Sequence, residues 1–353
     1  MIQFVKNKSN RGPLGEVARR LPRTSDEELV SVIIPAYNAQ ATLDDTLNSV
    51  RSQTHRNLEI VVVDDGSTDD TAIIAQRHSA VDARVRIIRQ DNAGVAAARN
   101  TGIAATSGRY VAPIDADDLW APSKIERQLV AAAKDQGKVG LVYSWFAVID
   151  QNNSVLRHED GADAEGVVLR QLLLGNFVGN GSSALILRSA IEFAGFYDVG
   201  LRASGCEGAE DYKMYLEIAE QYEFAIVPDY LTGYREYSGN MSSDVARMVR
   251  SRDVCVDEFA IRHPELRDTI ENGRTRYLRV MIVRSAREKR FVVAAQLFAT
   301  MLRQNPLGAV RAVIETVKNG VTRRRKHHSR GSGSRAVGNF EVGVPATRSS
   351  EQK

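Results

Sequence analysis

Three aspartates follow an apolar stretch in the segment RYVAPIDADDLW, residues 109–120. A charged side chain at the mouth of a buried strand is costly unless it is paired or binds a cation. Asp117 or Asp118 could cap a helix that opens near Pro122, since proline is favoured in a first helical turn. A cap needs only one carboxylate, however, and Asp115 and Asp117 stand at alternate positions, from which both can turn toward one point. Carboxylate oxygens are ligands that Mg²⁺ and Mn²⁺ prefer. The segment therefore fits either a helix cap or a divalent-cation site.

The segment VVVDDGSTDDT, residues 61–71, also leaves two interpretations open. In the first, Asp65, Gly66 and Ser67 form a turn, and a Ser, Thr or Asp caps the helix that follows. In the second, the Asp65 carboxylate accepts a hydrogen bond from the imide N–H of a uracil-like base, because charge-assisted hydrogen bonds are strong. Asp64 would then orient the loop.

Charged residues at two predicted helices are further candidates. Arg99 is surrounded by small residues in GVAAARNTG, which would leave its guanidinium accessible to a carboxylate or phosphate. A solvated arginine paired with a nearby acid explains the pattern equally well. Glu207, Glu210 and Asp211 stand at a predicted helix start, where the helix dipole favours acids. Asp211 is also the candidate for a general base that contacts an acceptor hydroxyl.

The segment TGYREYSGNMSSD, residues 232–244, predicts a polar loop that contains Arg235 and Tyr237. Loops of this Gly- and Ser-rich kind often close over a ligand. By itself the composition indicates only that a loop exists.

Apolar runs and amphipathic segments alternate from Val30 onward and predict the elements that position these residues. Strands are predicted at 29–35, 58–65, 83–89 and 108–115, with helices at 41–53, 67–79 and 94–106. Continuous apolar strands separated by helices indicate an α/β fold with a parallel sheet covered on both faces. Since ligands bind at the carboxyl ends of such strands, three groups of residues should line one edge of the sheet: Pro35–Asn38, Asp64–Ser67 and Asp115–Asp118. Less regular strands at 139–150, 182–188 and 222–228, with helices at 165–175 and 210–221, predict a mixed second half.

Composition divides the chain further. Residues 1–28 are predicted to be an N-terminal arm, 29–243 the α/β domain, 244–322 a helical region and 323–353 a disordered tail. The tail holds eight of the 47 Lys and Arg residues but only two of the 44 Asp and Glu residues. The body is therefore mildly acidic, which argues against nucleic acid as a partner.

Targeting signals and membrane spans are not predicted. No run of about 18 apolar residues occurs, and the N-terminus lacks the apolar middle of a signal peptide. The two cysteines are far apart in the sequence, which supports neither a structural zinc site nor a disulfide framework. We therefore expect a cytoplasmic protein. Helical spacing places Phe291, Ala295, Phe298 and Leu302 on one helix face. That face, next to the basic tail, would suit peripheral contact with an anionic membrane, or it could pack on the α/β domain or form a dimer.

The motifs together resemble the inverting family 2 glycosyltransferases. VSVIIPAYNA, VVVDDGSTDDT, GVAAARNTGI, IDADDLW and AEDYKMYLEIA occur in the order typical of that family, between about Val30 and Ser243. The resemblance implies the GT-A fold, a single α/β domain of two abutting halves with a mainly parallel central sheet and helices on both faces. The C-terminal helices would be an extension of it.

The resemblance also implies roles for the candidate residues. Asp211 would be the catalytic base, with Glu210 beside it on the acceptor side, and Asp117 would be the direct ligand of Mn²⁺ or Mg²⁺. Similar proteins often read Tyr-Arg-x-His where this chain reads YREY, so Tyr237 replaces a histidine able to contact metal or phosphate. The residues expected to bind the nucleotide-sugar donor are Pro35, Ala36, Tyr37, Asn38, Asp65, Arg99, Asp115, Ala116 and Arg235.

The implied activity is inverting transfer of one sugar from a nucleotide-diphosphate sugar, with UDP as the expected nucleotide, to a hydroxyl of a glycan or lipid-linked acceptor in cell-surface polysaccharide synthesis. Processive relatives carry a Q-x-x-R-W signature, which this sequence lacks. Two other functions remain open. A sugar-phosphate nucleotidyltransferase would release pyrophosphate, and a catalytically impaired nucleotide-sugar-binding protein, suggested by Tyr237, would bind without turnover.

Overall fold

The structure is a computed structural model that describes residues 27–135, 137–161, 163–237, 244–306, 309 and 338–342. The predicted arm and the predicted tail lie almost entirely outside these residues, and so does most of the last part of the predicted helical region, from residue 307 to residue 322.

The first half of the sheet has the alternation that the sequence predicts. Every residue of β1 is buried, and β2 is buried except at Glu59, because helices cover both faces of these strands. The elements in chain order are β1 (Val30–Ala36), α1 (Leu43–Arg51), β2 (Leu58–Asp64), α2 (Thr71–Val81), β3 (Val85–Arg89), α3 (Val95–Ala104) and β4 (Tyr110–Pro113).

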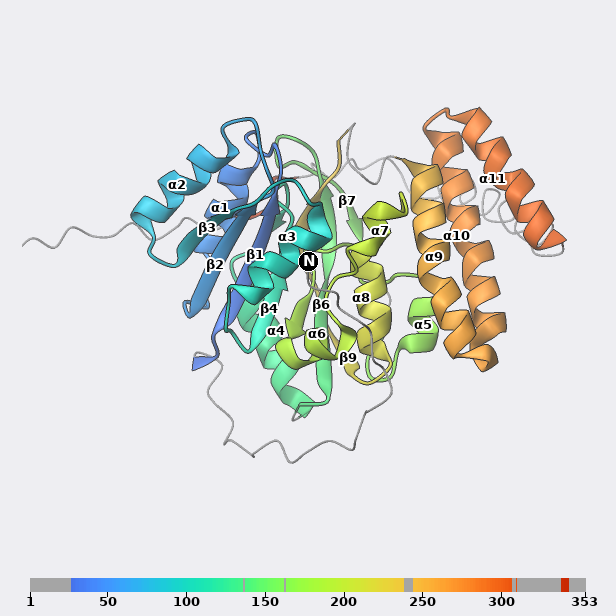
Figure 1. The fold of residues 1–353 in the computed structure, drawn as a ribbon, viewed down its shortest axis with the longest axis horizontal. Coiled ribbons are helices and arrows are strands. Elements are labelled where there is room, and N and C mark those ends of the chain that lie inside the picture. The colour runs from blue at the N-terminus through green and yellow to red at the C-terminus, as the bar shows by residue number, and fades with distance from the viewer. Residues whose placement is uncertain are drawn as a thin grey trace, which may run out of the picture.

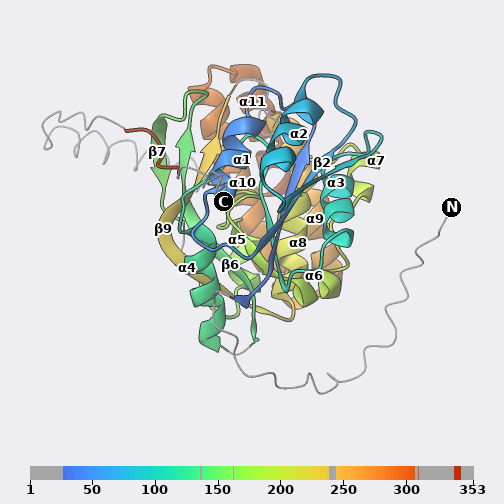
Figure 2. The ribbon, with the colours of Figure 1, turned by 90° about the vertical axis from the view of Figure 1, so that its left-hand side faces the viewer.

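The strand order β3-β2-β1-β4 puts the topological switch point between β1 and β4, which is where folds of this type have their ligand-binding crevice. β1 pairs in parallel with both β2 and β4, so the chain reverses its direction of winding after β3. Right-handed crossovers then place α1 and α2 on one face and α3 on the other, where α3 packs against β1 and β2 (Figures 1 and 2). The loops that follow β1 and β4 diverge at the carboxyl edge of the sheet, which is where ligands bind in such folds.

The second half of the sheet is mixed, as predicted. β8 runs antiparallel to β4 and β6, whereas β6 and β9 are parallel, so β6 and β9 end at the same edge as β1 and β4. The full order is β3-β2-β1-β4-β8-β6-β9-β5, with β7 paired to β6. The elements are β5 (Leu119–Trp120), α4 (Lys124–Ala132), β6 (Val139–Ile149), β7 (Val155–Glu159), α5 (Leu169–Leu174), β8 (Leu185–Leu187), α6 (Arg188–Ala194), α7 (Gly200–Ala203), α8 (Glu210–Ala219) and β9 (Glu223–Arg235).

The loop predicted from Thr232 is wrong at its start. Thr232–Arg235 extend β9, where they pair with Phe146–Ile149 of β6. The polar composition of this stretch is overridden because β9 also pairs with β5, which supplies hydrogen bonds on its other side. Arg235 is therefore held by the sheet, and Tyr237 follows two residues after the strand ends.

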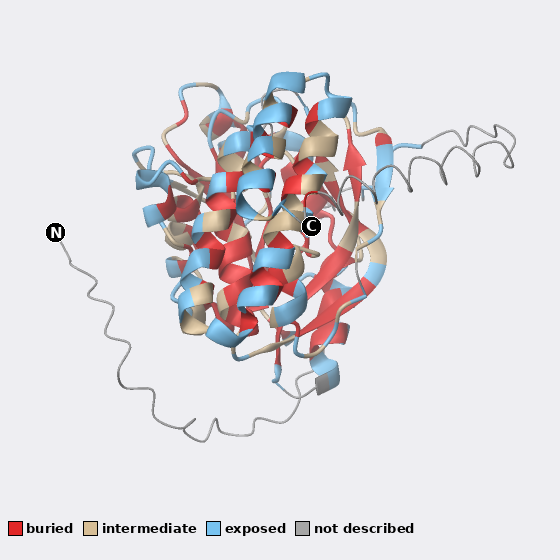
Figure 3. Cartoon of the chain, turned by 90° about the vertical axis from the view of Figure 1, so that its right-hand side faces the viewer, coloured by how far each residue is buried: buried red, intermediate tan, exposed pale blue. Residues whose placement is uncertain are grey.

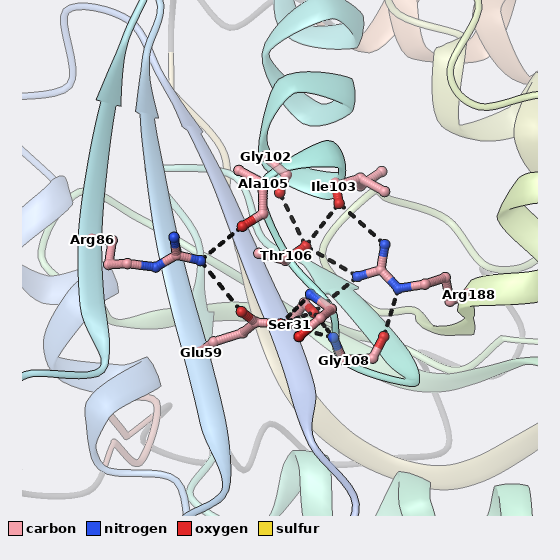
Figure 4. A network of polar contacts seen from close by, with 10 residues as sticks. Ser31, Glu59, Arg86, Gly102, Ile103, Ala105, Thr106, Gly108 and Arg188 are labelled. Atoms are coloured by element: carbon pink, nitrogen blue, oxygen red, sulfur yellow. Dashed lines mark hydrogen bonds and ion pairs between the residues drawn. The ribbon is translucent and has the colours of Figure 1, made fainter.

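A polar network fixes the turn between α3 and β4 at the amino edge of the sheet (Figure 4). The Glu59 carboxylate accepts hydrogen bonds from the Ser31 hydroxyl and from the N–H groups of Ser107 and Gly108. Burial would raise the pKa of Glu59, but these hydrogen bonds outweigh burial and lower it. The Arg188 guanidinium donates to Gly108 O, Ile103 O, Thr106 Oγ1 and Ser31 Oγ. The network holds the end of α3 against the start of β4.

Three longer helices follow the sheet: α9 (Val245–Arg262), α10 (Arg267–Arg287) and α11 (Phe291–Gln304). Val249, Leu278, Leu297 and Met301 contribute to a small apolar cluster between them. α11 packs through Ala294, Leu297 and Met301, whereas Phe291 and Leu302, on the face singled out from the sequence, are exposed. Within the described residues, no helix combines the length and apolar character needed to cross a bilayer.

Candidate functional site

Arg99 and Asp115 form an ion pair beneath the crevice. Nη2 of Arg99 donates to Oδ1 of Asp115 at 2.6 Å, and the guanidinium lies over the ring of Tyr197 at 5.1 Å from its centroid. Burial opposes the charge, but Asp115 raises the pKa of Arg99, so the cation is permanent. A Cβ at Gly181 would come within 2.7 Å of Arg99 Nη2, so only glycine leaves room for the guanidinium. The alternative of a solvated arginine paired with a nearby acid is right about the pairing, with Asp115, and wrong about the solvation, because Arg99 is 4% exposed.

The two acids at the start of α8 have different environments. Both carboxylate oxygens of Glu210 accept hydrogen bonds from the N–H of Gly208, at 3.0 and 2.9 Å, so Glu210 organises its own loop. Asp211 accepts from the N–H of Tyr212. Burial raises the pKa of Asp211 to about 6 against the opposing charge of Arg99, and the negative charge of Glu210 adds to the rise. Asp211 is therefore ionised near neutral pH and basic enough to accept a proton.

Asp117 and Asp118, in the loop that follows β4, have different environments. Asp118 is fully buried and accepts hydrogen bonds from the Ser182 hydroxyl at 2.5 Å and the Arg235 N–H at 2.8 Å. Asp117 is partly exposed; burial and the negative charge of Asp115 raise its pKa to about 6, while a hydrogen bond from the Tyr237 hydroxyl lowers it. Neither residue caps a helix, because α4 begins at Lys124 after Ser123. The helix-cap interpretation is therefore wrong for both.

The guanidinium of Arg235 contacts the backbone of this loop. Its Nε donates to the backbone oxygen of Asp117 at 2.7 Å, Nη1 to the oxygen of Asp150 at 2.8 Å and Nη2 to Asn153 Oδ1 at 2.7 Å. It is 1% exposed. In this arrangement Arg235 positions the backbone of Asp117, and its expected contact with a diphosphate stays a prediction.

Asp65 lies at the carboxyl end of β2, where it ties the start of α3 to that strand. Its carboxylate accepts hydrogen bonds from Gln90 Nε2 at 2.7 Å and from the N–H groups of Ala93 and Gly94 at 2.9 and 2.8 Å. The turn predicted at Gly66 is confirmed by its φ of +80°. A cavity of about 450 Å³ opens beside it, lined by Gly66, Arg89, Gln90 and Asp91.

The end of β1 borders the same region. Pro35 and Ala36 are buried in the strand, whereas Tyr37 is 54% exposed. Asn38 adopts a left-handed conformation with φ +49°, accepts from Thr68 N–H through Oδ1, and donates its own N–H to Ser67. Ala116 is buried, and its backbone oxygen accepts from two threonine hydroxyls of the α1 region, Thr42 and Thr46. Of these predicted pocket residues, Tyr37 and Asn38 are exposed, whereas Pro35, Ala36 and Ala116 are buried.

Sequence reasoning missed the loop 180–182. Ser182 Oγ accepts from the N–H of Asp115 and donates to Asp118, so it joins the two aspartates. The signal was present in the Gly, Asn and Ser residues of GNGSS before the apolar strand β8. Among the described residues, Asn180 Nδ2, Tyr197 Oη and Arg99 Nε are buried polar atoms without a hydrogen-bond partner. Unpaired buried donors around an ion pair are typical of a site that binds a polar ligand.

The donor atoms present fit a divalent cation only in part. Within the described part of the chain, no group of three or more His, Cys, Asp or Glu side chains could hold a metal. Asp118 is committed to Ser182 and Arg235, which leaves Asp115 and Asp117. Two carboxylates with a bound diphosphate and water match the way Mg²⁺ is usually held in nucleotide sites. The raised pKa of Asp117 beside Asp115 fits this assignment, because a cation would relieve the repulsion between the two charges.

Comparison with known proteins gives consistent matches. Residues 31–194 match the model of the family described as "Glycosyl transferase family 2". An uncharacterized glycosyltransferase from Haemophilus influenzae is 32% identical over 234 residues, which cover 62% of this chain and 68% of that protein. The UDP-Glc:alpha-D-GlcNAc-diphosphoundecaprenol beta-1,3-glucosyltransferase WfgD from Escherichia coli is 37% identical over 131 residues, covering 37% of this chain and 50% of WfgD. The chain spans about half the length of the first curated relatives that it matches.

Solved structures agree in fold. The mannosyltransferase PcManGT from Pyrobaculum calidifontis, solved in complex with GDP-Man and Mn2+, superposes with a TM-score of 0.53 at 23% identity. The superposition covers 83% of this chain and 80% of that one. This likeness confirms the predicted GT-A type of α/β fold.

Proposed function

The chain belongs to glycosyl transferase family 2, and from this premise we propose that it transfers a sugar from a nucleotide-diphosphate sugar to a hydroxyl of a glycan or lipid-linked acceptor in cell-surface polysaccharide synthesis. The observation that carries the proposal is the meeting of Arg99, Asp115 and Asp211 beside the crevice at the carboxyl edge of the sheet. A permanent cation, an acid paired with it and a second acid of raised pKa provide the groups for donor binding and proton removal.

The proposed donor is a UDP-sugar. The cavity at Gly66 and Gln90 lies next to Asp65, the residue proposed to contact the base. In the present structure Gln90 and two backbone N–H groups occupy the Asp65 carboxylate, so base binding would share or replace one of these hydrogen bonds. WfgD, whose name states UDP-Glc and a diphosphoundecaprenol-linked acceptor, supports both the nucleotide and the lipid-linked acceptor.

The proposed mechanism is a single displacement with inversion. Asp211 accepts the proton of the acceptor hydroxyl while that oxygen attacks the anomeric carbon from the face opposite the diphosphate. Arg99 holds Asp115 in place, and Arg235 and Ser182 hold the loop that presents Asp117. A Mn²⁺ or Mg²⁺ ion held by Asp117, with Asp115 beside it, would neutralise the departing diphosphate. Transfer of one sugar per encounter is part of the proposal, as is a cytoplasmic location with the acceptor at the membrane.

Calorimetric titration tests the donor class and the metal together. The chain would be titrated with UDP, GDP and dTDP, each with and without Mn²⁺. We expect UDP to bind most tightly and only with Mn²⁺, and Asp117→Asn to remove the metal dependence. The control is Asp229→Asn, which changes a half-exposed acid paired with Arg127. If none of the three nucleotides binds, the donor proposal fails.

A transfer assay separates the enzyme from an impaired binding protein. The hydrogen bond between Tyr237 and Asp117 is the observation that favours the second candidate, because the tyrosine replaces a histidine in the expected metal loop. Release of UDP from a UDP-sugar in the presence of acceptor would support the enzyme. Metal-dependent UDP binding without any release, over a panel of sugars and acceptors, would support the binding protein.

A further inference from the structure

The end of α10 and the whole of α11 have an unusual charge distribution. From residue 272 to residue 306 the sequence holds eight Lys and Arg residues and one acid, Glu288. α11 itself contains no acid, although the body of the chain is mildly acidic. Arg287 and Lys289 at the turn between the two helices are exposed, and Lys289 adopts φ +60° to form the turn. Arg274, Arg284 and Arg290 pair with neighbouring acids. The exposed positive charge at the turn therefore comes from Arg287 and Lys289.

Apolar side chains stand exposed beside these cations. Phe291 is 65% exposed, Val292 72% and Leu302 39%, because α11 turns Ala294, Leu297 and Met301 inward instead. The helices α9 to α11 are seen side-on in Figure 3. A cluster of apolar and basic side chains on one helix is the pattern of helices that lie in the interface of a bilayer.

The α10–α11 turn is linked to the candidate site through Glu236. β9 ends at the carboxyl edge of the sheet, and Glu236, the next residue, pairs with Arg284 of α10 at 3.5 Å. Arg284 lies one turn before the α10–α11 turn, and the neighbours of Glu236 are Arg235 and Tyr237 of the site. Figure 1 shows the α10–α11 turn at the top, the end of the molecule at which β1 and β9 finish. A flat partner at the turn would thus lie beside the crevice.

We propose that Arg287, Lys289, Phe291, Val292, Leu302 and Arg303, the basic–apolar face, dock the protein on an anionic phospholipid bilayer. The cations attract the lipid headgroups, and the apolar side chains enter the boundary between headgroups and acyl chains. A second copy of the chain fits this face less well. In a symmetric dimer the same cations would meet across the axis, and Glu236 and Glu288, two acids near the turn, are already paired with Arg284. The inference goes beyond the transfer reaction, and its test contains no nucleotide or sugar.

Vesicle flotation of the full chain tests the proposal. We expect the chain to float with vesicles of phosphatidylcholine and phosphatidylglycerol, to remain behind with phosphatidylcholine alone, and to be released by high salt. Arg287→Glu with Lys289→Glu should lower the partition coefficient by at least about tenfold, since each basic residue contributes substantially at such a surface. Phe291→Ser with Val292→Ser should lower it by a similar factor.

Matched controls locate the effect. Ile261→Ser removes a side chain of α9 that is 82% exposed, and Arg77→Glu reverses an exposed charge on α2; neither should change flotation. Neutralising residues 323–326, the RRRK of the tail, to glutamine in the full chain should leave most of the binding. Circular dichroism confirms that each variant is folded, and Arg287→Gln with Lys289→Gln serves as a milder second pair.

Three outcomes would overturn the proposal. The first is flotation that ignores the headgroup charge. The second is flotation lost with the tail substitution but kept in both α10–α11 pairs. The third is a chain that does not bind vesicles but sediments as a dimer, which Phe291→Ser with Val292→Ser converts to a monomer. None of these outcomes bears on nucleotide binding, so the proposed transfer reaction is judged separately.

Discussion

Two polar networks hold the same two elements, α3 and β4, at opposite edges of the sheet, and they differ in how completely their groups are paired. At the amino edge, the Arg188 guanidinium makes four hydrogen bonds, and hydrogen bonds lower the pKa of Glu59 (Figure 4). At the carboxyl edge, Arg99 Nε has no hydrogen-bond partner, and the pKa values of Asp117 and Asp211 are raised. The first network stabilises the fold, and the second has the unpaired donor and raised pKa values that are typical of ligand sites.

The raised pKa values at the carboxyl edge should lower the folding stability at neutral pH. A buried acid with a raised pKa is ionised at neutral pH only at the expense of folding stability, whereas an acid with a lowered pKa adds stability when ionised. Substitutions at the two edges should therefore change different quantities. Those at the carboxyl edge should lower activity and can raise stability, and those at the amino edge should lower stability with little effect on the reaction of the folded molecules.

The largest effect is expected for Asp211→Asn. Loss of the base should lower kcat about a thousandfold, while UDP affinity with Mn²⁺ changes little. Because the pKa of Asp211 is raised from 3.8 to about 6, the neutral amide should also increase the free energy of unfolding at pH 8, by on the order of 1 kcal/mol. This gain should vanish below about pH 4, where Asp211 is protonated in both folded and unfolded states. Transfer assays, calorimetry and urea unfolding at the two pH values provide the measurements.

Glu217→Gln is the control, because Glu217 lies on the same helix and pairs with Arg262 at 2.9 Å. It should leave kcat unchanged. Equal loss of nucleotide binding and transfer in Asp211→Asn would show that Asp211 supports the structure of the site and does not act as the base.

Arg188→Met should give the opposite result. It leaves Gly108 O, Ile103 O and two hydroxyls without their charged donor, so the free energy of unfolding should fall by about 2–3 kcal/mol. UDP affinity of the molecules that remain folded should stay within about twofold, since Asp115 and Arg99 are paired independently of Arg188. Urea unfolding and calorimetry below the unfolding transition measure the two quantities.

The same network supplies the control. Arg86 contacts Glu59 and Ala105, but its side chain is 50% exposed, so Arg86→Met should cost less than about 1 kcal/mol. A loss of UDP affinity in Arg188→Met far greater than in Arg86→Met would mean that the two edges are coupled and that the comparison between them is too simple.

Residues at the carboxyl edge of the sheet were easier to predict from the sequence than residues at the amino edge. The secondary structure was also predicted better in the first half of the fold than in the second. Each strand from β1 to β4 is a short continuous apolar run followed by polar residues, so both the elements and the edge they share could be recognised locally. Asp115, Asp117 and Asp211 could be singled out as candidates because they stand immediately after a predicted strand or at the start of a predicted helix.

The second half depended on contacts that no local pattern encodes. β7 was not predicted, and Arg235 was assigned to a loop, because the pairing of β9 with both β6 and β5 is decided by residues far away in the sequence. Arg188 was not singled out for the same reason. Its partners Ser31, Ile103 and Gly108 come from three other segments of the chain.

On the acidic side of the pH profile, kcat/KM should fall about tenfold per pH unit. With Asp211 as the base, kcat/KM at saturating Mn²⁺ should fall below about pH 6, because the protonated carboxyl cannot accept the acceptor proton. An unperturbed aspartate would place this limb near pH 4. Retention of full activity at pH 5, with the fold intact by circular dichroism, would contradict the raised pKa of Asp211. The pKa of Glu59, at the other edge, is lowered instead.

The smallest effect is expected at Tyr237. Its hydroxyl donates to Asp117, and burial with the charge of Asp117 raises the pKa of Tyr237 to about 12, so it remains a donor at any working pH. Tyr237→Phe removes this donor and should weaken Mn²⁺-dependent UDP binding about fivefold. Tyr237→His replaces the donor by a metal ligand and should strengthen Mn²⁺ binding. Calorimetric titrations with Mn²⁺ at fixed UDP measure both.

Tyr222→Phe is the matched control, since the Tyr222 hydroxyl contacts Ser189 of α6 at 3.4 Å, and it should leave both titrations unchanged. If Tyr237→Phe and Tyr237→His weaken binding equally, the hydroxyl orients Asp117 and no imidazole can take its place. If neither changes binding, Tyr237 contributes to the carboxyl edge no more than a surface residue does. A difference in sign between the two variants would show that this edge, unlike the fully paired network around Arg188, is still completed by its ligand.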